Sequence, residues 1–298
     1  MGEIGLIKHL AGRTRLDKSV VRGIGDDAAV VRWTKDRYLL LTCDMLVEDV
    51  HFRPSTATPY QIGWKALARN VSDIAAMGGV PKYALVSVGI RPETTLRFAD
   101  GLYRGMTDLA RKFRINIVGG DTTRSRKLVI DISLIGEVEK NSLALRSTAR
   151  PQDMIFVTGA IGGTAKGRHL DFMPRLVEAR QLVKNFKISS MIDISDGLLL
   201  DLWRILDASK VGGRIYEKLV PLSKEAGSFK RAVSEGEDFE LLFTMGRREA
   251  GRFLKTGLKK TKTPVTLIGH VTDRSGGYKL IRKDGKTETI KPEGYLHF

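Results

Sequence analysis

The chain has 298 residues, 42% of them hydrophobic, which is enough for a sizeable core and favours two domains over one. No stretch reaches the roughly 20 apolar residues needed to cross a bilayer, and the first residues lack the apolar core of a secretory signal. A single cysteine, Cys43, excludes an internal disulfide framework and a Cys-based zinc site. We therefore expect a cytoplasmic protein with no membrane partner.

The formal net charge is +16, and such an excess of Lys and Arg is often the footprint of nucleic-acid binding. Much of the excess, however, lies between Arg247 and Lys262, in what the pattern predicts to be an amphipathic helix and the loop after it. The sequence shows no aromatic–basic interleaving, Cys/His finger or basic heptads. We expect a solvated charged face and no nucleic-acid partner, with a basic, non-catalytic nucleic-acid-binding protein as the alternative.

In the first half of the chain, apolar runs rich in Val, Ile and Leu alternate with segments of helical period. This alternation favours layers of sheet and helix over a helical bundle. The predicted helices are 58–77 and 94–113, and the first starts at Thr58-Pro59 as a capped helix should. The predicted strands of this half are 28–33, 37–43, 83–91, 115–118 and 128–136.

A polar, proline-containing joint followed by a new apolar run, "ARPQDMIFVTG" at 149–159, indicates a change of domain. We predict an N-terminal domain over 1–145 and a C-terminal domain over 146–298. The predicted strands of the second half are 154–158, 189–194, 238–245, 264–270 and 278–282. Its predicted helices are 174–185, 197–209 and 247–257.

Aspartates recur at the ends of these apolar segments. Asp44, Asp121 and Asp193 close predicted strands, and carboxyl ends of strands are where open α/β sheets bind ligands. Further acids are Asp26 and Asp27 in "GIGDD", Asp73 on the first long helix, and Asp196. Taken alone, Asp196 could be a helix cap, Asp121 a turn residue and Asp73 part of the polar face of its helix. Their repetition predicts convergence instead.

Converging carboxylates need positive charge. Two unit charges 4 Å apart interact by about 4 kcal/mol at an effective dielectric constant near 20, so a bare cluster takes up protons or cations. Hard oxygen ligands with few histidines select Mg²⁺, which in turn implies a phosphate substrate. Neither common nucleotide fingerprint is present, because "GGTAKGRH" at 162–169 lacks the Lys-Ser/Thr pair of a Walker A loop and "GIGDDAAV" lacks a third glycine.

Six stretches in order resemble the motifs of the thiamine-monophosphate kinase family, and together they cover nearly the whole chain. They are "GIGDDAAV" (23–30), "TCDMLVEDVHF" (42–52), "KALARNVSDIAAMGGVP" (65–81), "NIVGGDTTRS" (116–125), "IDISDGLLLDL" (192–202) and "EGEDFELLF" (235–243). The resemblance implies a mixed α/β (α+β), two-domain aminoimidazole ribonucleotide synthetase-like fold. It also implies a homodimer formed through the N-terminal sheets.

The resemblance further implies that ATP gives its γ-phosphoryl group directly to thiamine monophosphate, yielding thiamine diphosphate and ADP, with several Mg²⁺ ions. No dedicated catalytic base is expected, because the acceptor phosphate is already an anion and a nucleophile. The implied magnesium ligands are Asp27, Thr42, Asp44, Asp73, Asp121, Asp193 and Asp196. The implied ATP contacts are Gly120, Arg146 and Ser195, and the implied contacts to thiamine monophosphate are His51, Glu237 and Tyr295.

Sister enzymes of the same superfamily remain alternatives, namely aminoimidazole ribonucleotide synthetase, selenophosphate synthetase and the hydrogenase-maturation dehydratase. A selenophosphate synthetase usually carries a reactive Cys or Sec near its N-terminus, and the maturation protein a C-terminal cysteine. This sequence has neither feature and ends in "GYLHF". The kinase is therefore the favoured interpretation.

Overall fold

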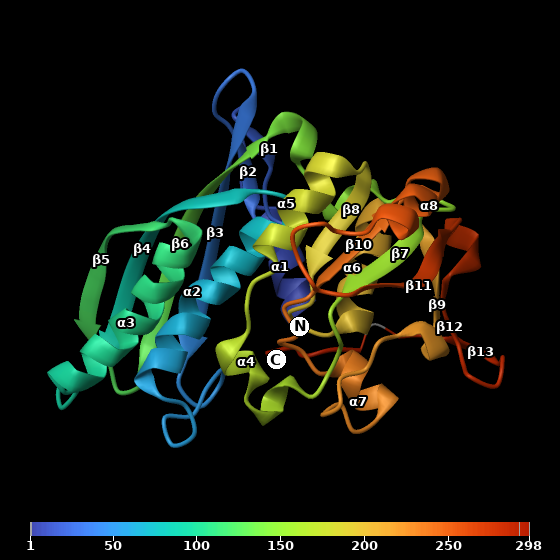
Figure 1. The fold of residues 1–298 in the computed structure, drawn as a ribbon. Helices are drawn as coiled ribbons and strands as arrows, with labels where there is room; N and C mark the ends of the chain where they lie inside the picture. The colour runs from blue at the N-terminus through green and yellow to red at the C-terminus, as the bar shows by residue number, and fades with distance from the viewer. Residues whose placement is uncertain (1, 292, 298) are drawn as a thin grey trace.

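A computed structural model of the chain describes residues 2–291 and 293–297. The N-terminal half holds a six-stranded sheet in the order β1-β2-β3-β6-β4-β5, antiparallel except for the β4–β5 pair. Two long helices lie against it (Figure 1). The elements are α1 (Glu3–Ala11), β1 (Val20–Arg22), β2 (Ala29–Arg32), β3 (Arg37–Val47), α2 (Pro59–Ala76), β4 (Val80–Ile90), α3 (Leu96–Phe113), β5 (Asn116–Arg124) and β6 (Val129–Glu139).

Helix α2 is fixed at its start by a capping box. The Thr58 hydroxyl accepts the backbone N–H of Gln61, the Gln61 side chain accepts the N–H of Thr58, and Pro59 occupies the first turn. The helix is largely buried, because it packs on the sheet, beside α3 and against the C-terminal half. The strands below alternate in burial, so that Leu40 and Ile132 face the helices.

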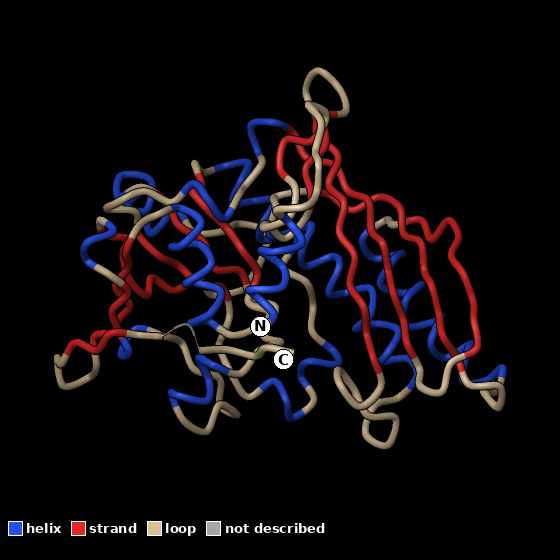
Figure 2. Tube along the Cα trace, turned by 180° about the vertical axis from the view of Figure 1, so that it is seen from behind, coloured by secondary structure: helices blue, strands red, loops and turns tan. Residues whose placement is uncertain are grey.

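None of the described helices covers the opposite face of the N-terminal sheet (Figure 2). Large apolar side chains on this open face are exposed to solvent, and a monomer rarely leaves such a patch uncovered. They are Leu41 (39%), Met45 (52%), Tyr83 (49%), Leu85 (45%) and Val118 (58%).

The C-terminal half is built on a seven-stranded sheet in the order β13-β12-β9-β11-β7-β10-β8. Its strands are β7 (Met154–Thr158), β8 (Ile188–Asp193), β9 (Gly212–Tyr216), β10 (Leu241–Met245), β11 (Val265–Thr272), β12 (Tyr278–Ile281) and β13 (Thr287–Thr289). Its helices are α4 (Arg168–Asp171), α5 (Leu176–Asn185), α6 (Leu198–Ser209), α7 (Phe229–Ser234) and α8 (Arg247–Thr256).

Side chains of β7 and β10 point alternately to the two faces of the sheet and so contribute to two hydrophobic cores. Phe156 and Phe243 stack on one side of the sheet, at 5.5 Å between ring centroids, and join the core that runs through α2. Ile155 and Leu242 point to the other side and pack with Leu202 of α6. The first core is continuous between the two halves, so the halves hold each other in place.

The long predicted elements are confirmed, and α2, α3, β7 and α6 match within about two residues. The strands that hold Asp44 and Asp121 are longer than predicted. Both acids therefore lie inside β3 and β5, and the inference from strand ends is wrong for them. It is right for Asp193, the last residue of β8. The patterns missed α1 and β1 and, in the C-terminal half, the helices α4 and α7 and the strands β9 and β13.

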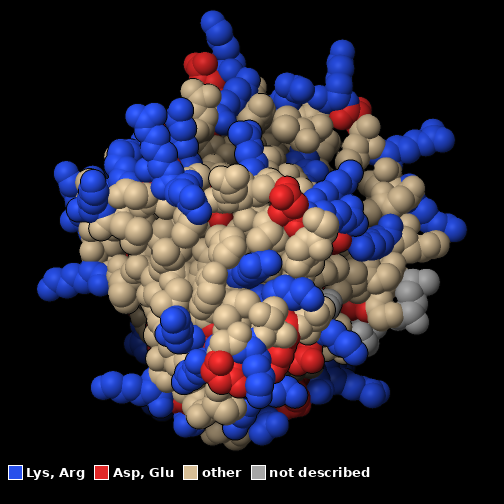
Figure 3. Space-filling model, turned by 90° about the vertical axis from the view of Figure 1, so that its right-hand side faces the viewer, with Lys and Arg blue, Asp and Glu red and all other residues tan. Residues whose placement is uncertain are grey.

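The predicted division at 145/146 falls in the connection between β6 and β7, which contains two short 3₁₀ turns. It stays a prediction. None of the described helices is long and apolar enough to cross a membrane. Lys and Arg project from many points of the face formed by the C-terminal half, interspersed with acidic side chains (Figure 3).

Candidate active site

Three aspartates from distant parts of the chain meet where the two halves join. Asp27 precedes β2, Asp73 lies on α2, and Asp193 ends β8. Each offers a carboxylate oxygen, and these oxygens all lie within 4.8 Å of one another. We call these residues the acidic cluster. A distance of this order allows one or more cations to be shared among the three carboxylates.

Side chains of the protein supply only part of the positive charge needed to compensate the three carboxylates of the acidic cluster. Arg146 pairs with Asp27 at 2.5 Å, the Ser72 hydroxyl donates to Asp193 at 2.6 Å, and the Thr42 hydroxyl donates to Asp73. Burial, followed by repulsion from neighbouring carboxylates, raises the pKa of Asp73 and of Asp193 well above the usual value. Carboxylate and hydroxyl oxygens under this repulsion suit a hard divalent cation such as Mg²⁺.

Two further predicted ligands lie beside the acidic cluster and pair with arginines. Asp44 on β3 contacts Arg69 at 3.0 Å, and Asp196 contacts Arg204 at 2.6 Å. The possible role of Asp196 as a cap of α6 is not realised. Instead, Asp201 accepts the backbone N–H groups of Asp196 and Gly197, at 3.0 and 3.1 Å.

A cavity of about 380 Å³ is lined by Arg69, the partner of Asp44, and by Ser195, two residues after Asp193. Among the residues lining it are five predicted from the sequence, namely His51, Ser195, Asp196, Glu237 and Tyr295. They come from the segment after β3, the β8–α6 turn, the segment before β10 and the C-terminal tail. The structure thus brings the predicted acceptor residues together, and we call this space the acceptor cavity.

A buried lysine holds one wall of the acceptor cavity. Lys65 on α2 is fully buried and contacts Glu237 at 2.5 Å and the carbonyl oxygen of His51 at 2.7 Å. Desolvation lowers the pKa of Lys65 to about 8, although the carboxylate of Glu237 opposes the shift. Glu237 is therefore held in place by a charged partner, and no second acidic side chain in the described part of the chain lies within ion-pair distance of Lys65.

His51 is neutral at physiological pH. Desolvation, then the positive charges of Arg69 and Lys65, lower its pKa to about 3. Its Nδ1 accepts the backbone N–H of Val47 at 3.0 Å, which leaves Nε2 as the protonated nitrogen. The C-terminal tail covers this region, since the ring of His297 lies 5.3 Å from that of His51 and 5.1 Å from that of Tyr295.

Gly120 and Asp121 lie away from the acidic cluster within one chain. Both belong to β5, the edge strand, and three steps of the sheet separate it from β3. Asp121 is exposed and stands opposite Ser87 of β4. Gly120 has φ +158°, and a Cβ there would lie 1.8 Å from the carbonyl oxygen of Val86, so only glycine fits. The structure therefore brings the other predicted residues together, but not these two.

Four further residues belong to the site and were not predicted from the sequence, namely Lys65, Arg69, Ser72 and Arg204. Lys65, Arg69 and Asp73 are spaced i, i+4, i+8, which puts them on one face of α2. That spacing, in a helix whose buried residues are otherwise mostly apolar, is the signal that could have found two of them.

Comparisons with known proteins agree with this geometry. The chain matches the family described as AIR synthase related protein, N-terminal domain, over residues 25–138, and its C-terminal domain over 150–281. It is 36% identical to a thiamine-monophosphate kinase of Bacillus subtilis (strain 168), over 100% of both chains. A thiamine-monophosphate kinase of Rhodopirellula baltica is 38% identical over 99% of this chain and 97% of its own. The chain belongs to the thiamine-monophosphate kinase family.

The likeness to thiamine-monophosphate kinases extends to the fold. A solved structure described as AaThiL complexed with AMPPCP and TMP is similar with a TM-score of 0.80 and 32% identity, covering 100% of this chain and 97% of that one. The family resemblance and the fold class expected from the six motifs are thereby confirmed.

Proposed function

We propose that the chain transfers the γ-phosphoryl group of ATP to the phosphate of thiamine monophosphate, giving thiamine diphosphate and ADP. The observation that carries this function is that one residue, Arg69, joins the acceptor cavity to the acids of the cluster. Arg69 lines the cavity, pairs with Asp44 at 3.0 Å and is attracted by the carboxylate of Asp73, and Asp196 lines the same cavity. Donor and acceptor phosphates placed on the two sides would meet at this junction.

Asp27, Asp73 and Asp193 are the residues we propose as the principal magnesium ligands, with Thr42, Asp44 and Asp196 adjoining them. Mg²⁺ would neutralise phosphate oxygens and align donor and acceptor. The side chains of this chain then have positioning roles. Arg146, which already contacts Asp27, and Ser195 would contact the nucleotide. No side chain has to remove a proton from the acceptor, because its phosphate is an anion before it binds.

The other side of the cavity suits a cationic heterocycle. Glu237, held by Lys65, places a carboxylate where the thiazolium ring would bind. Tyr295 offers an aromatic face to the same cation. The neutral imidazole of His51 can donate one hydrogen bond without adding a positive charge that would repel the ring. These features favour thiamine monophosphate over an acceptor without a positive charge.

The open face of the N-terminal sheet supports a homodimer. Its exposed apolar side chains form a patch that a second copy could cover by the same face, as two-fold symmetry requires. Gly120 and Asp121 lie on the edge strand of that sheet, separate from their own acidic cluster. We propose that Gly120 contacts the nucleotide bound by the partner subunit and that Asp121 binds a magnesium ion there. The single cysteine, Cys43, lies free on this sheet, which fits a reducing cytoplasm.

The direct test is turnover. Purified protein with ATP, Mg²⁺ and thiamine monophosphate should form thiamine diphosphate and ADP in equal amounts, measured by chromatography. Omission of the acceptor should leave ATP intact, and Asp193→Asn should lose activity while its far-UV circular dichroism spectrum is unchanged. ATP consumption without thiamine diphosphate would point to a sister activity and contradict the proposal.

A further inference from the structure

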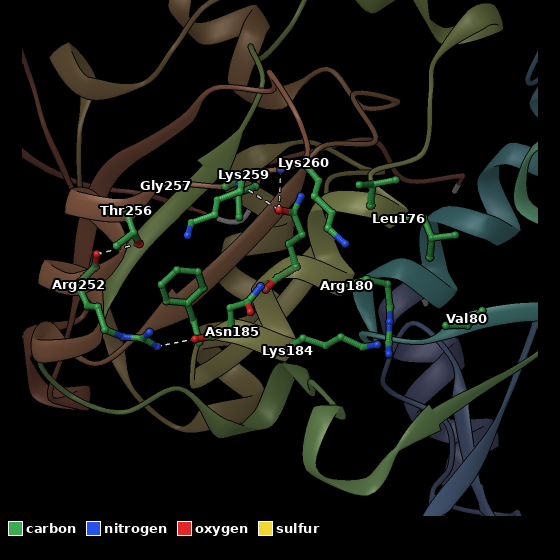
Figure 4. Close-up of a pocket in the computed structure, with 14 residues that line it drawn as sticks. Val80, Leu176, Arg180, Lys184, Asn185, Arg252, Thr256, Gly257, Lys259 and Lys260 are labelled. Atoms are coloured by element: carbon green, nitrogen blue, oxygen red, sulfur yellow. Dashed lines mark hydrogen bonds between the residues drawn. The ribbon is translucent and has the colours of Figure 1, made fainter.

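A second cavity, of about 620 Å³, lies in the C-terminal half (Figure 4). It is enclosed by α5, by the end of α8 and by the loop Gly257–Lys260, and Val80 of β4 reaches its rim. It shares no lining residue with the acceptor cavity. We call it the α5–α8 cavity.

The α5–α8 cavity is basic. Among its described lining residues are five that carry positive charge and none that carries negative charge, namely Arg180, Lys184, Arg252, Lys259 and Lys260. The five surround the space from several sides (Figure 4). Crowded like charges repel one another, so the cavity attracts an anion.

The arginines and the lysines differ in how they are used by the fold. Arg180 bonds the carbonyl oxygen of Gly78 and pairs with Glu139 at 2.7 Å. Arg252 bonds the carbonyl oxygen of Asn185 and pairs with Glu249. For the three lysines, no acidic side chain in the described part of the chain lies within ion-pair distance. The lysines are therefore the charges available to a ligand.

The remaining lining is mostly apolar. Leu176 and Val177 from α5, Leu258 from the loop, and Val80 supply aliphatic surface, and Phe186 supplies a ring that is itself 8% exposed. A monatomic or purely inorganic anion would leave this surface in contact with water. A ligand that has both an apolar body and an anionic end would cover it.

One buried donor in the wall has no acceptor. Gln181 is 8% exposed, and its Oε1 accepts the backbone N–H groups of Lys259 and Lys260 at 3.0 and 2.8 Å. These two bonds fix which end of the amide is oxygen. The Nε2 atom is then a buried donor that finds no partner among the described residues. An unsatisfied buried donor costs about 1–3 kcal/mol, which a ligand oxygen would recover.

We propose that the α5–α8 cavity binds a small organic phosphate with an uncharged ring, such as a nucleoside phosphate. The ring would lie against the aliphatic side chains, the phosphate groups would contact Lys184, Lys259 and Lys260, and a rotation of the Gln181 amide would turn its buried Nε2 toward the ligand. Three available lysines favour a ligand with two or more negative charges over a single carboxylate. The same charges disfavour the cationic thiazolium of the kinase substrate.

ADP is the probe, and EDTA separates the two sites. Because the proposed kinase site holds nucleotide through Mg²⁺, ADP that binds in EDTA reports on the α5–α8 cavity. Isothermal titration of the whole protein should give one ADP per chain in EDTA. Inorganic phosphate should bind at least about tenfold more weakly, since it cannot bury the apolar wall. Asp73→Asn, which alters the kinase site, should leave this binding unchanged.

Two variants test the assignment of residues. Gln181→Glu keeps the oxygen that accepts from Lys259 and Lys260 and replaces the amide donor by a negative oxygen. It should weaken ADP binding by about tenfold or more, as loss of a hydrogen bond to a charged group predicts. The double change Lys184→Glu with Lys259→Glu should do the same. The matched control is Lys218→Glu with Lys224→Glu, two exposed lysines that do not line the cavity, and its affinity should stay within about twofold of the wild type.

Thermal unfolding and thiamine diphosphate formation should be measured on every variant, so that misfolding and failure of the kinase site are recognised separately. Absence of ADP binding in EDTA overturns the proposal. So does binding that Gln181→Glu and the lysine pair leave unchanged, or binding that Asp73→Asn abolishes. Equal affinity for ADP and inorganic phosphate overturns the proposed role of the ring.

Discussion

The acidic cluster and the β5 edge carry the same residue type in opposite settings. Asp27, Asp73 and Asp193 are held together inside one chain, with hydroxyl and guanidinium partners around them. Asp121 stands exposed on an edge strand and bonds only its neighbour's N–H, that of Thr122, among the described contacts. The cluster is already organised before a ligand binds, whereas Asp121 is not.

The negative charges of the acidic cluster and of Asp121 are compensated in different ways. Carboxylates that are buried together cost free energy unless a cation joins them, so the cluster is a site by its own electrostatics. An exposed carboxylate is compensated by water and needs no partner to be stable. Asp121 therefore acquires a role only when another molecule reaches β5.

The largest expected effect is on the cluster. Asp73→Asn should lower kcat/KM for thiamine monophosphate by at least about 10³-fold, because bound metal ions stabilise the transition state by several kcal/mol. In EDTA the melting temperature should be no lower than that of the wild type, since a repelling buried charge has been removed. Asp36→Asn, on an exposed loop, is the control. Full activity of Asp73→Asn would remove it from the site.

The second prediction tests whether β5 serves the partner's cluster. Asp73→Asn and Asp121→Asn should each be inactive alone. Co-expressed in equal amounts, they should regain about a quarter of wild-type activity, because half of the dimers are mixed and each mixed dimer has one intact site. Activity that stays at the level of the single variants would place both residues in the same subunit's site.

The third prediction separates the two regions by stability. Mg²⁺ at about a hundred times its dissociation constant should stabilise the wild type by about 2.7 kcal/mol. Asp121→Asn should respond in the same way, and Asp193→Asn should not. Differential scanning fluorimetry across a Mg²⁺ series measures the shift. A normal response of Asp193→Asn would mean that the ion binds elsewhere.

The prediction furthest from catalysis concerns Asp238, a buried acid outside the cluster. Desolvation raises its pKa to about 8, although the N–H of Gly162 and the guanidinium of Arg168 oppose the shift. Between the unfolded value and about 8 the folded state binds the extra proton, so stability falls as pH rises. From pH 5 to 8 the wild type should lose more free energy of unfolding than Asp238→Asn, measured in urea, by up to about 1.4 kcal/mol per pH unit. Parallel pH profiles would contradict this.

Local signals in the sequence were enough for the long elements and for the members of the acidic cluster. The Thr58-Pro59 start predicted α2 because capping depends on residues next to one another. Asp27, Asp73 and Asp193 were predicted through motifs, and the fold brings them within reach of a shared ion. The strand-end inference was wrong for Asp44 because β3 continues to Val47 as one long antiparallel partner of β6.

Other parts of the site depend on distant residues. Nothing near Lys65 in the sequence indicates that it will be buried against Glu237, because the two meet only when the halves pack. The position of Asp121 relative to the cluster depends on strand order, which local patterns do not contain. The α5–α8 cavity likewise arises from the packing of two helices and a loop that are separated in the chain.

Helix α2 sets the spacing between the parts of the site. Lys65 contacts Glu237 at the acceptor cavity, Arg69 contacts Asp44, and Asp73 belongs to the acidic cluster. Successive members of this series are four residues apart, which is about 6 Å along the helix axis. Inserting one alanine between Arg69 and Asp73 would turn Asp73 by about 100° away from its neighbours while preserving every side chain. The number of residues between these positions is therefore as important to the site as their identity. Substitutions in this part of α2 can leave the geometry of the site intact, whereas an insertion or deletion cannot.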